Sequence, residues 1–127
     1  MHRWTIEPGT HTPRVVIDSD KSLLFIEGRS YPEEGMEFYD PILSKMREMA
    51  RSGDPIRHVH LRLEYYNSST AKALADLFSV IRKIHEGGVA VRVQWEYEED
   101  DEGIRDDIDM FAATHPFPFE VSHTTFD

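Results

Sequence analysis

Two segments of the chain alternate regularly between apolar and polar positions. The first spans residues 56–66 and the second residues 89–97. Their apolar positions are Val59, Leu61, Leu63 and Tyr65, and Val89, Val91, Val93, Trp95 and Tyr97. Strands that are covered on both faces read as continuous apolar runs, whereas alternation is typical of a strand with one buried face. The pattern therefore predicts a two-layer α/β sandwich in which the helices pack on one face of the sheet.

Shorter patterns predict the elements that precede these strands. Residues 15–18 and 23–28 favour two strands joined by a turn at residues 19–21. Residues 33–51 favour a helix. Its predicted buried face consists of Met36, Tyr39, Leu43, Met46 and Ala50. Because proline disrupts a helix interior, Pro41 predicts either a kink or a helix that restarts with Asp40 as its cap.

The strongest helical periodicity follows the first alternating segment. Its apolar positions are Ala71, Leu74, Leu77, Phe78, Ile81 and Ile84, and Gly87-Gly88 provides a stop. A third helix is predicted from about residue 102 to residue 113, through Ile104, Ile108 and Phe111, with a short last strand at residues 119–122. Since no linker or internal repeat interrupts these elements, we expect a single domain over residues 1–127.

Composition narrows the classes of function. The 127 residues include no cysteine, which excludes disulfides and thiolate chemistry. The net charge of −10 argues against nucleic-acid binding, which requires clustered Lys and Arg. Without a long apolar run or a signal-peptide pattern, we expect a cytoplasmic protein that does not insert into membranes. The acidic run over residues 96–109 predicts a solvated face, with docking of a basic partner or a loose divalent-cation site as the alternatives.

A metal site and a catalytic site are both weakly supported by the sequence. His58 and His60 occupy alternate strand positions, about 6.5–7 Å apart on one face, which is close enough to share a zinc ion. Spacing fixes no third ligand, and His115, His123 or Glu64 would serve only if the fold brought one of them near. No nucleophile elbow or P-loop is present. We therefore expect no cofactor and no catalytic residues, and a small metal-dependent enzyme is the least favoured alternative.

The segment from Tyr65 to Lys72 joins a strand pattern to a helical pattern and contains Ser68, Ser69 and Thr70 in succession. A helix N-terminus favours anions because it presents unpaired N–H groups and the positive end of the helix dipole. No capping box forms, and Lys72 lies where acidic residues are usual. Ordinary capping with a solvated lysine and a phosphate-accepting site both fit this pattern.

The same segment resembles the signature of the SiaC-type regulatory phosphoproteins, a bacterial family with a STAS-like fold. In that family an aromatic-X-Asn-Thr-Ser-Ser-X-Lys stretch carries the phosphorylated hydroxyl directly after the Asn. Further landmarks occur here in the family order, so the resemblance covers nearly the whole chain. They are Thr12-Pro13, Gly28-Arg29-Ser30-Tyr31-Pro32-Glu33, Gly87-Gly88 and Phe117-Pro118-Phe119.

Alignment on Asn67 and Lys72 places the family phosphosite on Ser68. Ser69 and Thr70 are the alternates, since the family usually has Thr where this chain has Ser68. The resemblance further implies that phosphate or partner contacts are made by Asn67, Lys72, Tyr31, Pro32 and Glu33.

The resemblance also implies a function. The protein would be a non-enzymatic regulator with a STAS-like mixed sheet, and its unphosphorylated form would bind and activate a diguanylate cyclase, raising cyclic di-GMP in biofilm signalling. A dedicated kinase would phosphorylate the motif and switch the partner, and a PPM-type phosphatase would reverse the modification. The alternative is a generic STAS partner switch, such as an antagonist of an anti-sigma factor, that uses the same site.

Overall fold

The computed structural model describes residues 3–126, which form six strands and three helices. In chain order the elements are β1 (Arg3–Ile6), β2 (Arg14–Asp18), β3 (Leu23–Ser30), α1 (Gly35–Arg51), β4 (His58–Tyr66), α2 (Ser68–Glu86), β5 (Arg92–Glu98), α3 (Glu102–Thr114) and β6 (Phe119–Thr124). None of the described helices is long and apolar enough to cross a membrane.

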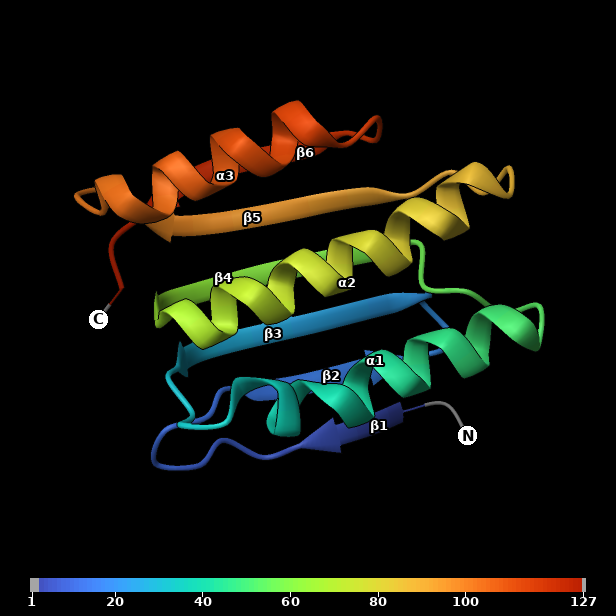
Figure 1. Cartoon of the computed structure of the whole chain (residues 1–127), viewed down its shortest axis with the longest axis horizontal. Helices are drawn as coiled ribbons and strands as arrows, with labels where there is room; N and C mark the ends of the chain where they lie inside the picture. Colours follow the sequence, from blue (N-terminus) through green and yellow to red (C-terminus); the bar gives the residue numbers. More distant parts are fainter. Residues whose placement is uncertain (1–2, 127) are drawn as a thin grey trace.

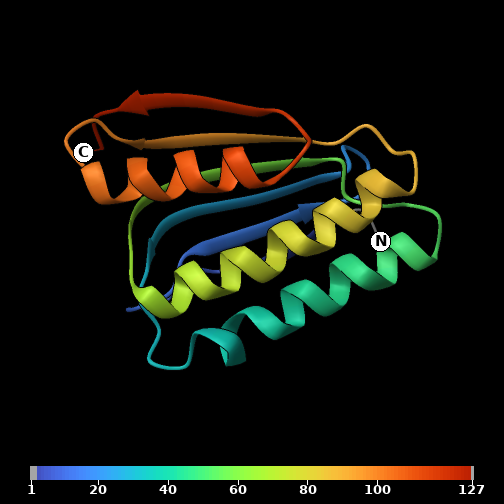
Figure 2. The same ribbon diagram turned by 45° about the horizontal axis from the view of Figure 1, so that its top comes forward.

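The six strands lie in the sheet in the same order as in the chain. The first three pair antiparallel, whereas β3 to β6 pair parallel. Each parallel connection carries a helix, and all three helices cover the same face of the sheet (Figures 1 and 2). The predicted two-layer architecture with a mixed sheet is therefore confirmed.

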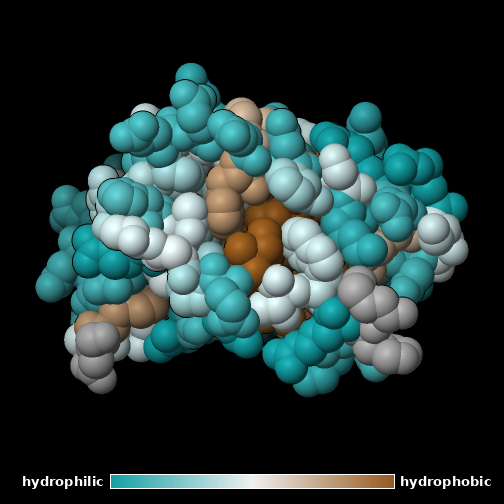
Figure 3. All heavy atoms as spheres, turned by 90° about the horizontal axis from the view of Figure 1, so that it is seen from below, coloured by the Kyte–Doolittle hydropathy of each residue, from teal (hydrophilic) through white to brown (hydrophobic). Residues whose placement is uncertain are grey.

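The core lies between this helical layer and the sheet. Its central side chains include Leu61 and Trp95 from the sheet and Ile42, Leu74 and Phe78 from the helices, all fully buried. Trp4 and Ile6 of the edge strand β1 pack against this core and stay partly accessible. On the side of the molecule where β1 forms the sheet edge, a small apolar patch lies among hydrophilic residues (Figure 3).

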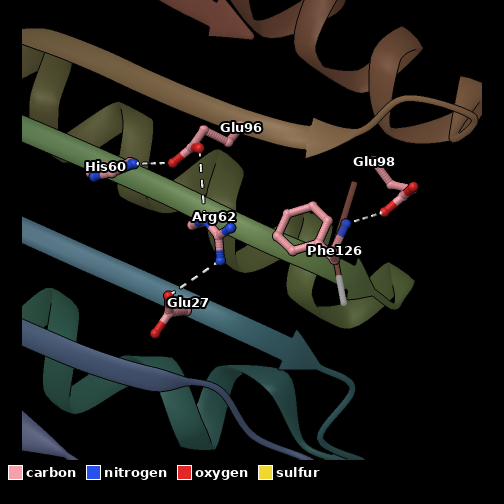
Figure 4. A network of polar contacts seen from close by, with 6 residues as sticks. All are labelled: Glu27, His60, Arg62, Glu96, Glu98 and Phe126. Carbon is pink, nitrogen blue, oxygen red and sulfur yellow. Dashed lines mark hydrogen bonds and ion pairs between the residues drawn. The ribbon is translucent and has the colours of Figure 1, made fainter. Parts of the chain in front are cut away.

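The opposite face of the sheet carries polar side chains, as the alternation predicted. Arg62 lies between Glu27 and Glu96, at 3.5 and 3.6 Å, and His60 Nε2 lies 2.6 Å from Glu96 (Figure 4). The chain beyond β6 crosses onto this face, where the ring of Phe126 stacks on the Arg62 guanidinium at 4.9 Å. These partly exposed charges contribute little stability individually, because water screens them.

The predicted helices and strands are present, and the structure differs from the prediction in several details. The helix α1 begins at Gly35, with Glu34 at its N-cap position but without a side-chain capping hydrogen bond. It continues through Pro41, so the alternative of a restart at Asp40 is wrong. Met36 is 38% exposed instead of buried, because the buried stripe of α1 starts one position earlier, at Gly35. The sequence pattern also missed β1 and placed Val89 in β5, which begins at Arg92.

A further difference lies at the end of β4. In the pairing of β3 with β4, Gly28 faces Leu63 but Arg29 faces Tyr65, so Glu64 is an extra residue in the ladder. An extra residue reverses the alternation beyond it. Tyr66 is consequently buried and Tyr65 is 44% exposed, so the prediction that Tyr65 shares the apolar face of Leu63 is wrong.

This bulge yields a test by paired substitution. Leu63→Ala should lower the free energy of unfolding by about 2–5 kcal/mol, because it opens a cavity in the core. Tyr65→Ala should cost less than about 1 kcal/mol, since that ring is largely exposed. Urea unfolding of both variants measures the difference. Similar losses for the two variants would contradict the bulged register.

Candidate functional site

Asn67 forms the junction between β4 and α2. Its extended backbone makes it the N-cap, and its side-chain Oδ1 accepts hydrogen bonds from Thr70 N and Ser69 Oγ, both at 3.0 Å. Its Nδ2 donates to the carbonyl of Pro32 at 3.1 Å, and its backbone N donates to the carbonyl of Ser30 at 3.1 Å. Asn67 therefore joins the start of α2 to the segment that follows β3, using both ends of its amide.

Thr70 is fully buried and its hydroxyl is engaged in hydrogen bonds. Its Oγ1 donates to the carbonyl of Ser30 at 3.0 Å, and Ser30 Oγ lies 2.8 Å from both Thr70 Oγ1 and Tyr39 Oη. A hydroxyl has a single proton to donate. Ser30 must therefore donate to Thr70 and Tyr39 to Ser30. Burial raises the pKa of Tyr39 to about 12, which keeps that proton in place at neutral pH.

Ser69 is partly buried beside α1. Its Oγ lies within hydrogen-bond distance of the Pro32 carbonyl, at 3.2 Å, and of Asn67 Oδ1. A Cβ atom on Gly35 would come within 2.6 Å of this hydroxyl, so α1 approaches α2 closely only because residue 35 has no side chain. The hydroxyl of Ser69 thus lies between two helices and already has partners.

Ser68 differs from both neighbours. It is exposed, and its hydroxyl makes no hydrogen bond within the described part of the chain. It lines a surface groove of about 430 Å³ between the start of α2 and the start of α3. The remaining lining residues are Tyr65, Tyr66, Asn67, Ala71, Asp101, Gly103, Ile104 and Asp107. We call this feature the Ser68 groove.

The Ser68 groove is acidic. Asp107 accepts a 2.6 Å hydrogen bond from the hydroxyl of Tyr66, and Asp101 caps α3 by accepting from Ile104 N at 2.9 Å. Burial, followed by the bond to Asp107, raises the pKa of Tyr66, so that its hydroxyl stays a donor. No Lys or Arg is among the residues that line the groove. Both carboxylates belong to the acidic run over residues 96–109. The sequence pattern did not indicate that this run lies beside Ser68.

The other predicted contact residues lie in three different environments. Pro32 is buried and acts through its carbonyl, which holds Asn67 and Ser69. Lys72 is exposed, one helical turn after Ser68, and has no ion pair within residues 3–126. Glu33 is exposed and likewise has no described side-chain partner.

Tyr31 belongs to an aromatic surface cluster beside the groove. Its ring packs edge-on against Tyr65 at 5.9 Å and against His11 at 4.9 Å, and the Arg29 guanidinium lies 5.8 Å from both tyrosine rings. Tyr65 also lines the Ser68 groove, so it connects the two features. Sequence reasoning missed this role of Tyr65, because regular alternation would have turned its side chain into the core.

His58 and His60 point the same way, with parallel rings 6.2 Å apart. His60 contacts Glu96, and His58 Nδ1 lies 3.4 Å from an Arg92 nitrogen. Burial, and then the charge of Arg92, lower the pKa of His58. Among the described residues no group of three potential ligands could hold a metal ion, and neither His115, His123 nor Glu64 joins the pair.

Comparison with known proteins gives a consistent match over the whole fold. The sequence model of the SiaC family regulatory phosphoproteins matches residues 6–124. An uncharacterized protein of Pseudomonas aeruginosa (strain UCBPP-PA14) is 30% identical over 115 residues, which cover 90% of this chain and 91% of that protein.

Solved structures agree with this match. The crystal structure of apo-SiaC from Pseudomonas aeruginosa superposes with a TM-score of 0.84 at 28% identity, covering 96% of this chain and 99% of that one. SiaC in the crystal structure of diguanylate cyclase SiaD in complex with its activator SiaC, from the same organism, gives a TM-score of 0.85 at 27% identity, covering 95% and 99%.

The different environments of Thr70 and Ser68 predict different costs of removing each hydroxyl. Thr70→Val keeps the shape of the side chain but leaves buried partners without a hydrogen bond, so it should cost about 1–3 kcal/mol of unfolding free energy. Ser68→Ala should change stability by less than about 0.5 kcal/mol, as for other surface substitutions. Denaturant titration measures the free energy of unfolding of both variants. Equal losses would contradict the chain of hydrogen bonds from Tyr39 through Ser30 to Thr70.

Proposed function

The chain belongs to the SiaC family of regulatory phosphoproteins, and on this premise we propose that Ser68 is its phosphoacceptor. One observation carries the proposal: of the three consecutive hydroxyls at the start of α2, Ser68 alone is exposed and without a side-chain partner in the described residues. A kinase must reach the hydroxyl and accept its proton. Thr70 fails the first condition, and Ser69 would have to give up its contacts with Pro32 and Asn67.

The proposed role is that of a non-enzymatic regulator whose unphosphorylated form binds and activates a diguanylate cyclase. The support is the similarity in sequence and fold to SiaC of Pseudomonas aeruginosa, described as the activator of the cyclase SiaD. The Ser68 groove and the adjoining Tyr65–Tyr31 cluster supply a surface for such a partner. Partly exposed aromatic rings beside a groove are typical of the central contacts in protein interfaces.

Phosphorylation would change this surface in two physical ways. A phosphate adds about −1.5 to −2 charges at neutral pH, together with three strong acceptor oxygens. A phosphate placed inside the groove would face Asp101 and Asp107, so its favourable placement is at the groove's edge, away from these acids. A partner shaped for a neutral hydroxyl would have to desolvate the new charge, which opposes binding.

Lys72 and the open N–H groups of α2 are the groups available to hold such a phosphate away from the two acids. Residues i and i+4 of a helix lie on the same face, which places Lys72 within reach of a group on Ser68. The cap made by Asn67 does not involve the Ser68 hydroxyl, so the fold should survive the modification. A dedicated kinase and a PPM-type phosphatase would set the phosphorylation level, in the cytoplasm.

The assignment of the acceptor is tested with the cognate kinase and ATP. We expect one phosphate per chain, mapped to Ser68 by fragmentation mass spectrometry, and loss of labelling in Ser68→Ala. Ser69→Ala serves as the matched control and should label like the wild type. Undiminished labelling of Ser68→Ala would move the site to Ser69.

The switch is tested by binding to the cognate cyclase. Ser68→Ala should bind and activate it like the wild type, whereas the phosphorylated protein should bind at least about tenfold more weakly, a loss of roughly 1.4 kcal/mol. Ser68→Asp should have a smaller effect, since a carboxylate has less charge and fewer acceptors than phosphate. Equal activation by the phosphorylated and unmodified proteins would refute charge-controlled docking.

A further inference from the structure

A second groove lies away from Ser68, between the C-terminal halves of α1 and α2. It has a volume of about 460 Å³ and an apolar floor. Its lining residues are Arg47, Ala50, Arg51, Pro55, Ser79, Val80, Lys83, Ile84, Gly87 and Val89. We call it the α1–α2 groove. Its volume is within the range of about 300–1,000 Å³ that is usual for small-molecule sites.

The charges around this groove are opposite to those of the molecule as a whole. The chain has 24 acidic and 14 basic residues, yet the groove is lined by three basic side chains, Arg47, Arg51 and Lys83, and by no acid. All three are exposed and have no hydrogen bond or ion pair from their side chains within residues 3–126. By contrast, the nearby Lys45 and Arg82, which do not line the groove, pair with Glu48 and Glu86.

Helix geometry explains only part of this arrangement. Cations in the last turn of a helix interact favourably with its dipole, which accounts for Arg51 in α1 and Lys83 in α2. Arg47 lies one turn earlier, where the dipole effect has faded. The dipole also gives no reason for an apolar floor between the three charges.

We propose that the α1–α2 groove binds a small amphipathic carboxylate, such as a medium-chain fatty acid. The apolar tail would lie along Val80, Ile84 and Val89, and the carboxylate would be held by Arg47, Arg51 and Lys83. An Arg guanidinium binds a carboxylate through two parallel hydrogen bonds, and such charge-assisted bonds are about twice as strong as neutral ones.

The surroundings of the groove favour a small ligand over a protein. A stable protein interface buries about 800 Å² on each partner and has an apolar centre. The large apolar side chains that are exposed in the described chain are Met36, Tyr65, Met110 and Val121, and none of them lines this groove. No exposed large apolar side chain of the described chain therefore extends the apolar floor of this groove beyond its own lining residues.

The proposal is tested by calorimetric titration of the full chain with octanoate. 1-Octanol has the same tail without the charge, and acetate has the charge without the tail. We expect saturable one-to-one binding of octanoate and at least about tenfold weaker binding of the other two. Octanol loses the charge-assisted contacts, and acetate loses the burial of the apolar tail. The amide signals that shift in NMR spectra should belong to α1 and α2 around the groove.

Substitutions locate the charge effect. The triple variant Arg47→Gln, Arg51→Gln, Lys83→Gln removes only exposed charges and should fold normally, yet bind octanoate at least about tenfold more weakly. Lys45→Gln, also on α1 but outside the groove, is the matched control and should bind like the wild type.

Several results would overturn the proposal: no saturable binding, equal binding of octanol, shifts elsewhere in the protein, or an unaffected triple variant. A last titration uses a synthetic helical peptide of Leu and Glu in place of octanoate. If it occupied the groove and octanoate did not, the groove would be a protein-docking surface instead.

Discussion

The amide of Asn67 is the contact on which the rest of the site depends. One side chain caps α2, receives the Ser69 hydroxyl and holds the Pro32 carbonyl, while its backbone N bonds Ser30. The end of β3, the segment between β3 and α1, and the start of α2 therefore meet around a single residue. Beneath it, the buried proton chain from Tyr39 to Thr70 satisfies polar groups that would otherwise be costly in the core.

This arrangement gives three consecutive hydroxyls three different environments. Thr70 belongs to the core network, Ser69 lies against α1, and Ser68 faces solvent. Successive helical residues are turned by about 100°, so neighbouring hydroxyls necessarily face different environments. A phosphate on Ser68 can thus alter the surface without breaking the cap, whereas the same group on Thr70 would require the helix start to open.

Hydrophobic periodicity predicted the long helices and strands correctly. It failed where a local irregularity determined the direction of a side chain. The buried stripe of α2 and the one-sided alternation of β4 and β5 gave the layers correctly, because burial imposes these periods. The extra residue at Glu64 has no signal in the alternation, yet it turns Tyr65 outward into the Ser68 groove. Likewise, Asp101 and Asp107 were visible as acids, but only the packing of α3 beside α2 brings them to Ser68.

The positions of Asp101 and Asp107 affect the electrostatic free energy of a phosphate at the start of α2. A helix dipole contributes typically about 0.3–1 kcal/mol to an exposed anion at its N-terminus. Two unit charges about 4 Å apart repel by about 1 kcal/mol in water, and by about 4 kcal/mol at the effective dielectric of a protein surface. A dianion that faced both carboxylates would feel several such repulsions, which outweigh the dipole. The favourable placement is therefore toward Lys72 and away from α3. Phosphorylation would then turn the new charge out of the groove and onto the exposed face of α2, where a docked partner would meet it.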